Sequence, residues 1–341
     1  MTSCTRGAGA LPADYRIRPG IGRSGDLVLA RVLEVGCYPR VEIPSGREVR
    51  LRAGDELVAV LGNRQSSTSL VGGVPADGLP VGHGCRADLL AAGGVVGITE
   101  CSPSFLGPPT RLELIGLLHD GRTGLALTPK AGPEPAGNCP IVFVGGTAAE
   151  VGKTTFAAAL VHHLAREFRV GVTKLAGTGR LRDLLTLADA GAVCAADFVD
   201  AGLATTYGHD GSVVVAAAHH LVDRLVAAGS EVIVAELGGD LWAAGIPALL
   251  ADPALRQAAC ALVLVPSDTM ASLGAHTWLA EQQLDLPVAH AVPYRNVLAA
   301  RQRLRDGLGV EPFDATSAED LQRFCAEFGL TARARPELAT T

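Results

Sequence analysis

Residues 141–155 read IVFVGGTAAEVGKTT, an apolar run that breaks into a glycine-containing loop and ends in Gly-Lys-Thr-Thr. The pattern predicts a buried parallel strand over Ile141–Val144, then a phosphate-binding loop, then a helix from Lys153 to about Arg166. Backbone N–H groups of such a loop and the N-terminus of such a helix face one point. The expected occupant is therefore an anion with two or more phosphates.

Composition excludes several classes of function. The 341 residues are ample for a large core, and 48% apolar content with a net charge of −6 is typical of a soluble globular protein. Lys and Arg do not cluster and only 4% of residues are aromatic, so we expect no nucleic-acid surface. Apolar runs stop well short of the ~20 residues that a bilayer requires. No charged start precedes an apolar core, so we expect no membrane contact and a cytoplasmic protein.

Four segments are expected along the chain. Residues 1–24 are rich in Gly, Arg and Pro and predict a loose N-terminal arm. Short β-type runs with turn-forming residues between them predict a small β-rich domain, a barrel or sandwich, over residues 25–129. Residues 130–138 have the composition of a linker, and residues 139–335 form the expected nucleotide-binding domain.

The β-rich segment is predicted to contain one helix and one polar loop. Arg86–Ala92 looks like a short helix capped by Gly93 and Gly94. The polar segment over residues 62–69 follows a predicted strand, where it is either a solvated loop or a contact for a polar substrate.

The C-terminal segment alternates apolar strands with helical stretches. Strands are predicted at 141–144, 169–173, 231–235, 261–265 and 287–291. Continuously apolar strands in such alternation predict an α/β fold, a P-loop domain with a parallel sheet covered on both faces. Ligands of these folds bind beyond the carboxyl ends of the strands, so the residues that follow each strand matter most.

Several polar residues occupy those positions. Lys174 follows the second strand and would bring another positive charge to the phosphates. Glu236 ends the third strand, where a carboxylate can anchor magnesium beside the loop hydroxyl of Thr154. Asp197 and Asp200 are alternative carboxylate ligands for the same ion, and we place Asp200 in the metal site.

These motifs resemble the dethiobiotin synthetase family of ATP-dependent ligases over about residues 138–300. The loop, with five residues between Gly146 and Gly152, resembles that family's Gly-Thr-x-x-Glu-Val-Gly-Lys-Thr loop. Lys174, Thr178 and Gly179 match its Lys-Pro-x-x-(Thr/Ser)-Gly segment, whose lysine contacts the reacting carbamate and phosphate. A further match is its Glu-Gly-x-Gly-Gly segment, and one asparagine falls where the family contacts the base; the residues concerned are Glu236, Gly238, Gly239 and Asn296.

The resemblance implies an ATP- and Mg²⁺-dependent ligase. It would transfer the γ-phosphoryl group to a carboxylate or carbamate, and an amine would then attack the mixed anhydride. Its catalytic residues would be Lys153, Lys174 and Thr178, and its metal ligands Thr154, Asp200 and Glu236. Its nucleotide contacts would be Gly146, Thr147, Glu150, Val151, Gly152, Lys153, Thr154, Thr155, Gly238, Gly239 and Asn296. The expected partners are a small molecule with a carboxylate or an amine, and a second copy in a homodimer.

Two alternatives stay open. The β-rich N-terminal segment is absent from a simple dethiobiotin synthetase, and the two-part layout also resembles a P-loop family that includes D-glutamate N-acetyltransferases. In that case the loop would hold the pyrophosphate of coenzyme A. The other alternative is a nucleotide-dependent switch or chaperone that docks a partner.

Overall fold

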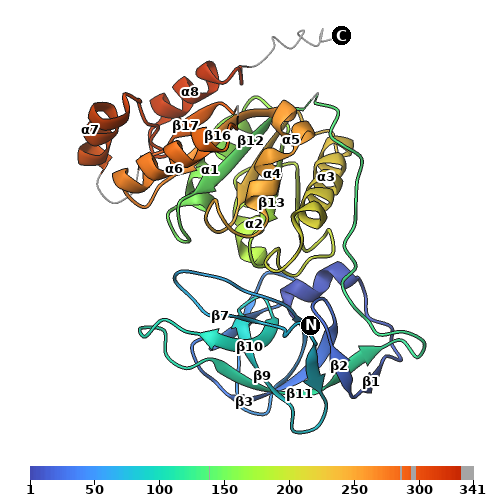
Figure 1. Cartoon of the computed structure of the whole chain (residues 1–341). Helices are drawn as coiled ribbons and strands as arrows, with labels where there is room; N and C mark the ends of the chain where they lie inside the picture. Colours follow the sequence, from blue (N-terminus) through green and yellow to red (C-terminus); the bar gives the residue numbers. More distant parts are fainter. Residues whose placement is uncertain (138, 285, 293–296, 332–341) are drawn as a thin grey trace.

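A parallel sheet forms the centre of the C-terminal half of the computed structural model, which describes residues 1–137, 139–284, 286–292 and 297–331 (Figure 1). The six strands, in spatial order, are β14 (Cys194–Asp197), β13 (Val170–Ala176), β15 (Val232–Leu237), β12 (Ile141–Gly146), β16 (Ala259–Val265) and β17 (Val288–His290). Five of them confirm predicted strands. The sixth, β14, is a short Cys-Ala-Ala-Asp run at the sheet edge, too weakly apolar to be recognised from its pattern.

Helices cover both faces of this sheet. Ile141 and Phe143 point into one core and Val142 and Val144 into the other, as the period of two in a strand requires. The first core packs against α3 (Gly211–Ala227), α4 (Ile246–Ala251), α5 (Pro253–Ala258) and α6 (Thr269–Glu281). The second packs against α1 (Lys153–Leu164), α2 (Leu181–Asp189) and α8 (Ala318–Glu327), while α7 (Val297–Leu308) lies beside α6. The predicted P-loop α/β fold is confirmed.

The strand register sets charged side chains next to one another at the carboxyl edge of the sheet. Lys174 on β13 is the register partner of Glu236 on β15 and of Asp197 on β14. Glu236 is in turn paired with Val144 of β12, directly before the phosphate-binding loop. Residues far apart in sequence therefore meet at the edge where ligands of open α/β sheets bind.

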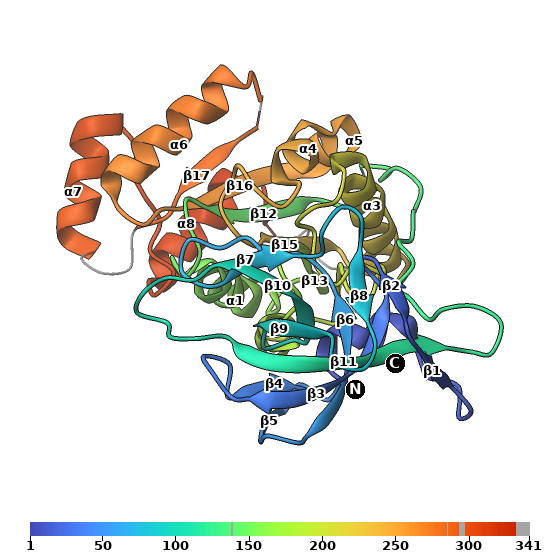
Figure 2. The same ribbon diagram turned by 60° about the horizontal axis from the view of Figure 1, so that its bottom comes forward.

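The N-terminal half contains a small closed barrel, which faces the viewer in Figure 2. Its ring consists of β3 (Leu27–Glu34), β6 (Glu56–Leu61), β10 (Val95–Cys101), β9 (Arg86–Ala91) and β11 (Thr110–His119), which pairs back with β3. Short strands decorate it: β1 (Arg16–Arg18), β2 (Gly20–Gly22), β4 (Arg40–Glu42), β5 (Glu48–Arg50), β7 (Val71–Gly73) and β8 (Leu79–Val81).

The helix expected at Arg86–Ala92 is wrong. This segment is β9, which pairs with β10 on one side and with β11 on the other. Ala87 and Leu89 are buried inside the barrel. Pairing on both edges closes the barrel and outweighs the local helical preference of an Ala-Asp-Leu-Leu-Ala run.

Residues 1–24 differ from a loose arm at their beginning. Ser3–Ala8 form a 3-10 helix, η1, whose Cys4 is fully buried. Helix η1 lies between the two halves of the molecule, where the Cys4 thiol donates to the Gly179 carbonyl at 3.2 Å. A Cβ on Gly179 would lie 2.5 Å from the Cys4 sulfur, so the close approach needs glycine there.

Glu42 joins the two halves. It lies on β4 with no exposed surface, yet its carboxylate accepts from the backbone N–H groups of Leu181 at 2.6 Å and Arg182 at 2.8 Å. The Ser3 hydroxyl donates to it at 2.5 Å. Helix α2 receives no side-chain cap from its own Arg180, so its N-terminus is capped from the barrel half.

None of the helices in the described part of the chain has the length and apolar character of a membrane span.

Candidate functional site

Lys153 lies inside the predicted phosphate-binding loop. Its ammonium donates to the carbonyl oxygens of Ala148 at 2.6 Å and Gly239 at 2.8 Å. Burial lowers the pKa of Lys153 to about 8, although nearby Glu236 opposes the shift. The loop thus holds a charged donor in a desolvated place, where attraction to phosphate oxygens is strong.

The loop backbone adopts two left-handed positions. Gly152, directly before α1, has φ of +101°, which glycine adopts without strain. Glu150 has φ of +59°, a conformation that costs a non-glycine residue roughly 1 kcal/mol or more. Such turns aim successive N–H groups inward and form an anion-binding concavity.

Thr154 and Glu236 form the part of the site that suits a magnesium ion. Glu236 is almost completely buried at the end of β15, and the Thr154 hydroxyl bonds to it. The second carboxylate oxygen of Glu236 is buried and has no hydrogen-bond partner among the described residues, and burial raises the pKa of the group. A hydroxyl and a carboxylate beside a phosphate loop are the hard oxygen donors that Mg²⁺ prefers. These residues fit the ion.

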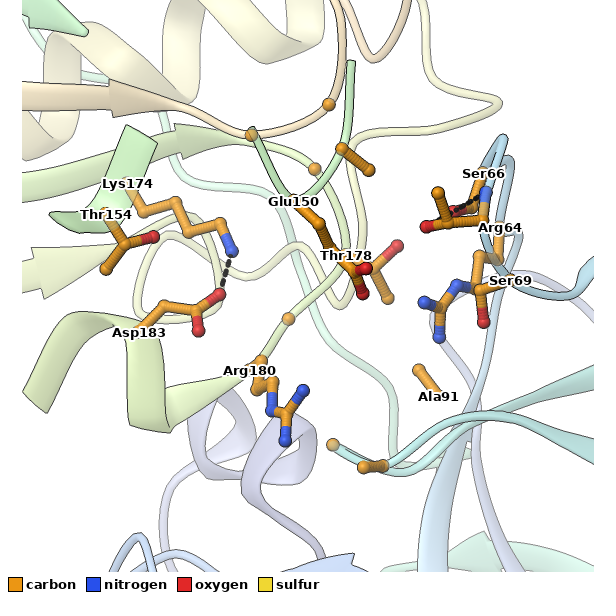
Figure 3. Close-up of a pocket in the computed structure, with 18 of the residues that line it drawn as sticks. Arg64, Ser66, Ser69, Ala91, Glu150, Thr154, Lys174, Thr178, Arg180 and Asp183 are labelled. Atoms are coloured by element: carbon orange, nitrogen blue, oxygen red, sulfur yellow. Dashed lines mark hydrogen bonds and ion pairs between the residues drawn. The ribbon is translucent and has the colours of Figure 1, made fainter. Parts of the chain in front are cut away.

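Lys174 has a partner that the sequence analysis did not single out. Its ammonium donates to the Asp183 carboxylate at 2.5 Å, and both groups line the same cavity (Figure 3). Burial lowers the pKa of Lys174, but the carboxylates of Asp183, Glu236 and Asp197 together outweigh it, and the net pKa is raised. Lys174 is therefore charged and fixed in orientation throughout the physiological range.

Gly238 allows the backbone after β15 to approach Lys174. A Cβ there would lie 2.4 Å from the Ala176 carbonyl oxygen and 2.8 Å from Cε of Lys174. Gly239 has φ of +104°, and a Cβ on it would meet the Tyr207 hydroxyl at 2.8 Å. Both glycines line the cavity, and larger residues would displace the groups around the lysine.

The placement of Asp200 in the metal site needs correction. Arg6, from the N-terminal helix η1, pairs with both Asp197 and Asp200. Asp200 also accepts from the backbone N–H of Asp197 at 2.9 Å, and neither side chain lines the cavity. The two carboxylates therefore hold the N-terminal segment. Sequence spacing could not reveal this, because Arg6 is almost 200 residues away.

One cavity of about 560 Å³ collects most of the predicted residues. From the α/β half it is lined by Glu150, Gly152, Lys153, Thr154, Thr155, Lys174, Thr178, Glu236, Gly238 and Gly239. Four predicted contacts are elsewhere or undescribed. Gly146 ends β12, Thr147 accepts from the Ser267 N–H at 2.9 Å, Val151 packs in a core, and Asn296 lies outside the described residues.

The opposite wall of the cavity comes from the barrel half. Part of it is the polar segment after β6, and Figure 3 shows Arg64, Ser66 and Ser69 facing the P-loop side across the cavity. This segment therefore lines a cavity and is not a purely solvated loop. Sequence analysis missed Asp183, Arg180 and Tyr38, because a lone charge on a helix or a tyrosine in a loop carries no recognisable spacing.

Comparisons with known proteins add little to this geometry. No family model matches the chain, and no curated protein matches it significantly. Among solved structures, a plasmid partition protein from Borrelia burgdorferi shows 10% identity and a TM-score of 0.38, covering 56% of this chain and 99% of that one. The 54 kDa signal recognition particle protein of Aeropyrum pernix, in complex with GDP, shows 18% identity and a TM-score of 0.36. That match covers 57% of this chain and 47% of the other.

A DUF1611 family protein from Anabaena variabilis is similar at the same level, with 18% identity, a TM-score of 0.35, and coverage of 59% of this chain and 62% of that one. TM-scores below 0.5 carry no argument about function. The P-loop architecture of the C-terminal half rests on its own loop, strand order and lysine.

Proposed function

We propose that this chain is an ATP- and magnesium-dependent enzyme that transfers the γ-phosphoryl group of ATP to a small acceptor bound between its two halves. One observation carries the proposal. A single cavity has the phosphate loop with Lys153 and the Thr154–Glu236 pair on one side, and a polar wall from the barrel half on the other. Nucleotide and acceptor would therefore meet in one desolvated space.

Each residue has a role in this proposal. Lys153 and the N–H groups of the loop would bind the β- and γ-phosphates. Thr154 and Glu236 would hold magnesium, which neutralises charge on the phosphates. Lys174, held by Asp183, would attract the acceptor and offset the repulsion between two anions. Thr178, which lines the cavity between the two walls, would donate to the acceptor or to the transferring group.

The finer assignment is a C–N ligase, which rests on the resemblance of the motifs to dethiobiotin synthetases. In that reaction an acceptor carboxylate or carbamate oxygen attacks the γ-phosphorus and ADP leaves. An amine then attacks the carbonyl carbon of the mixed anhydride, and phosphate leaves. The first step is the one that the cavity geometry supports.

The Thr154–Glu236 pair, which fits a magnesium ion, favours ATP over coenzyme A as the ligand of the loop. A coenzyme A pyrophosphate needs no metal, which would leave the buried oxygen of Glu236 without a partner at a cost of roughly 1–3 kcal/mol. The polar acceptor wall favours an enzyme over a switch, because a switch needs no site for a second small molecule next to the γ-phosphate.

Calorimetry with Mg-ATP and with acetyl-CoA tests the proposal directly. We expect micromolar Mg-ATP binding that Lys153→Ala abolishes, and no acetyl-CoA binding. Lys130→Ala is the matched control, because Lys130 is exposed and donates to the Asp200 carbonyl outside the cavity. Acetyl-CoA binding without ATP binding would reverse the assignment. ATP binding without ADP release, in the presence of small carboxylates and amines, would favour the switch.

A further inference from the structure

Arg64 is a rigidly placed cation on the acceptor wall. Its backbone pairs with Gly72 through hydrogen bonds of 2.8 and 3.0 Å, just after β6. One terminal nitrogen of its guanidinium donates to the Leu90 carbonyl at 2.6 Å, and the group lies 5.5 Å from the centre of the Tyr38 ring. These contacts aim the half-buried side chain into the cavity, as Figure 3 shows.

The charge of Arg64 lacks a carboxylate partner within the ranges that the structure describes. Three other cations around the cavity differ in this respect, and Arg182, which also lines it, is exposed to solvent. Lys174 pairs with Asp183 at 2.5 Å, Arg180 pairs with Glu48 at 3.0 Å, and Lys153 lies in the field of Glu236. The Nε of Arg64 is also buried and has no acceptor in the described part of the chain. Half-burying a guanidinium whose N–H donors lack acceptors costs free energy, unless an anion binds and accepts those hydrogen bonds.

Residues with hydroxyl groups line the cavity on the same wall as this guanidinium. Ser66 and Thr68 lie on the same loop, and the Tyr38 hydroxyl bonds to Ser69 beside the ring that Arg64 covers. Hydroxyls and a guanidinium together make a donor-rich lining, and the planar fork of the guanidinium suits the geometry of a carboxylate. Lys174, a cation on the opposite wall, is already paired with Asp183.

We propose that Arg64 binds one carboxylate of the acceptor, while Lys174 presents a second carboxylate to the γ-phosphate. The acceptor class is thus a small dicarboxylate. The role of the carboxylate at Lys174 rests on the proposed function, but carboxylate binding at Arg64 does not. The proposed function and the Arg64 site can therefore fail separately. Absence of ADP formation would count against phosphoryl transfer alone, whereas the loss or retention of acid binding decides the Arg64 site.

The test is calorimetry without nucleotide, using succinate, glutarate and adipate, with their diamides as uncharged probes of equal length. We expect at least one diacid to bind and no diamide to bind. Arg64→Gln should weaken the diacid about tenfold or more, the typical value of a charge-assisted hydrogen bond. Arg64→Lys should weaken diacid binding less than Arg64→Gln does, because lysine keeps the positive charge. Some loss remains because lysine lacks the forked donor geometry of the guanidinium.

Two further variants locate the bound acid. Arg86→Gln is the matched control, since Arg86 is exposed on β9 and lies outside the cavity. Lys153→Ala should leave diacid affinity within a few-fold. Retained Mg-ATP binding shows that each Arg64 variant is folded. If Arg64→Gln does not fold, the diacid affinity of Arg64→Lys tests the proposal instead.

Three outcomes would overturn the inference. One is that no diacid binds wild-type protein up to about 10 mM, an affinity worth less than ~3 kcal/mol. Another is that Arg64→Gln and Arg86→Gln bind the diacid equally. The last is that binding is lost with Lys153→Ala but kept with Arg64→Gln, which would place the acid on the phosphate loop.

Discussion

The two walls of the cavity are built in opposite ways. On the α/β wall, Lys174 and Glu236 lie near the ends of adjacent parallel strands and Lys153 begins helix α1. The lysines there meet carboxylates: Lys174 pairs with Asp183, and Lys153 lies near Glu236. On the barrel wall, the functional side chains come from an irregular loop, and Arg64 has no carboxylate partner among the residues described.

This difference separates chemistry from selectivity. Paired charges on regular elements are held in position before any ligand arrives, which is what stabilising a transferring phosphoryl group requires. An unpaired charge on a loop gains its partner only when a ligand binds, which makes that ligand's charge and length decisive. The α/β wall is therefore the catalytic side of the proposal, and the barrel wall is its selective side.

The largest expected effect concerns Lys174. Lys174→Met should lower kcat/KM for the acceptor by roughly 10²- to 10³-fold and leave ATP affinity within a few-fold, because the ammonium acts on the reacting group. Met would leave the half-buried Asp183 without its lysine partner, so Lys174→Met/Asp183→Asn is measured beside it to remove that structural cost. Equal loss of ATP binding in the double variant would move Lys174 to the nucleotide.

Glu236 tests the metal part of the same wall. Glu236→Gln keeps the volume but removes the negative charge, so apparent magnesium affinity in the turnover assay should fall by up to about 10²-fold. Thermal unfolding should change little, since the glutamine fits the same space. An unchanged magnesium requirement would remove Glu236 from the metal site.

Glu42 tests how the two walls are fixed to each other. Glu42→Gln replaces one of two acceptor oxygens by an amide nitrogen that cannot accept from the α2 N-terminus, and should lower unfolding free energy by about 2 kcal/mol. Hydrogen exchange at the Leu181 and Arg182 amides should accelerate. Glu56→Gln, which breaks an exposed pair with Arg31, should cost well under ~1 kcal/mol. Similar losses in both variants would show that the buried cap does not couple the halves.

The smallest expected effect is a pH dependence of nucleotide binding. The pKa of Lys153 is lowered to about 8, so below pH 8 the side chain is mostly charged and above it mostly neutral. If only the charged form binds phosphate, the dissociation constant for Mg-ATP should rise about tenfold between pH 7 and 9. The terminal phosphate titrates near pH 6 and changes little in this window. Lys130→Ala should follow the wild-type curve, and a flat wild-type curve would contradict the assignment.

The fold of the α/β half was readable because its signals are local. A buried strand is a short apolar run, and a phosphate loop is a fixed spacing of Gly, Lys and Thr. Lys153, Thr154, Lys174 and Glu236 could therefore be predicted to meet, since each follows or ends a strand and carboxyl ends of parallel strands share one edge. The edge strand β14 was not predicted from the sequence, because a short, weakly apolar run has little recognisable periodicity.

The barrel half was readable only in part. Its hairpins follow from turn residues, but β9 looks helical by composition, and only pairing with β10 and β11 makes it a strand. The same limit explains Asp200. Its spacing with Asp197 suits a metal pair, and only the folded chain shows that Arg6 forms ion pairs with both.

The sequence by itself determined the phosphate loop, the parallel sheet and the side chains at the sheet's carboxyl edge, because backbone geometry forces strand-end residues together. Tertiary structure alone decided which charges are already paired and what stands opposite the loop. Arg64 faces the P-loop across the cavity, and Glu42 caps a helix of the other half, because of how the two halves pack. Contacts between segments more than a hundred residues apart have no spacing rule, so they depend on shape and burial that only the folded chain has.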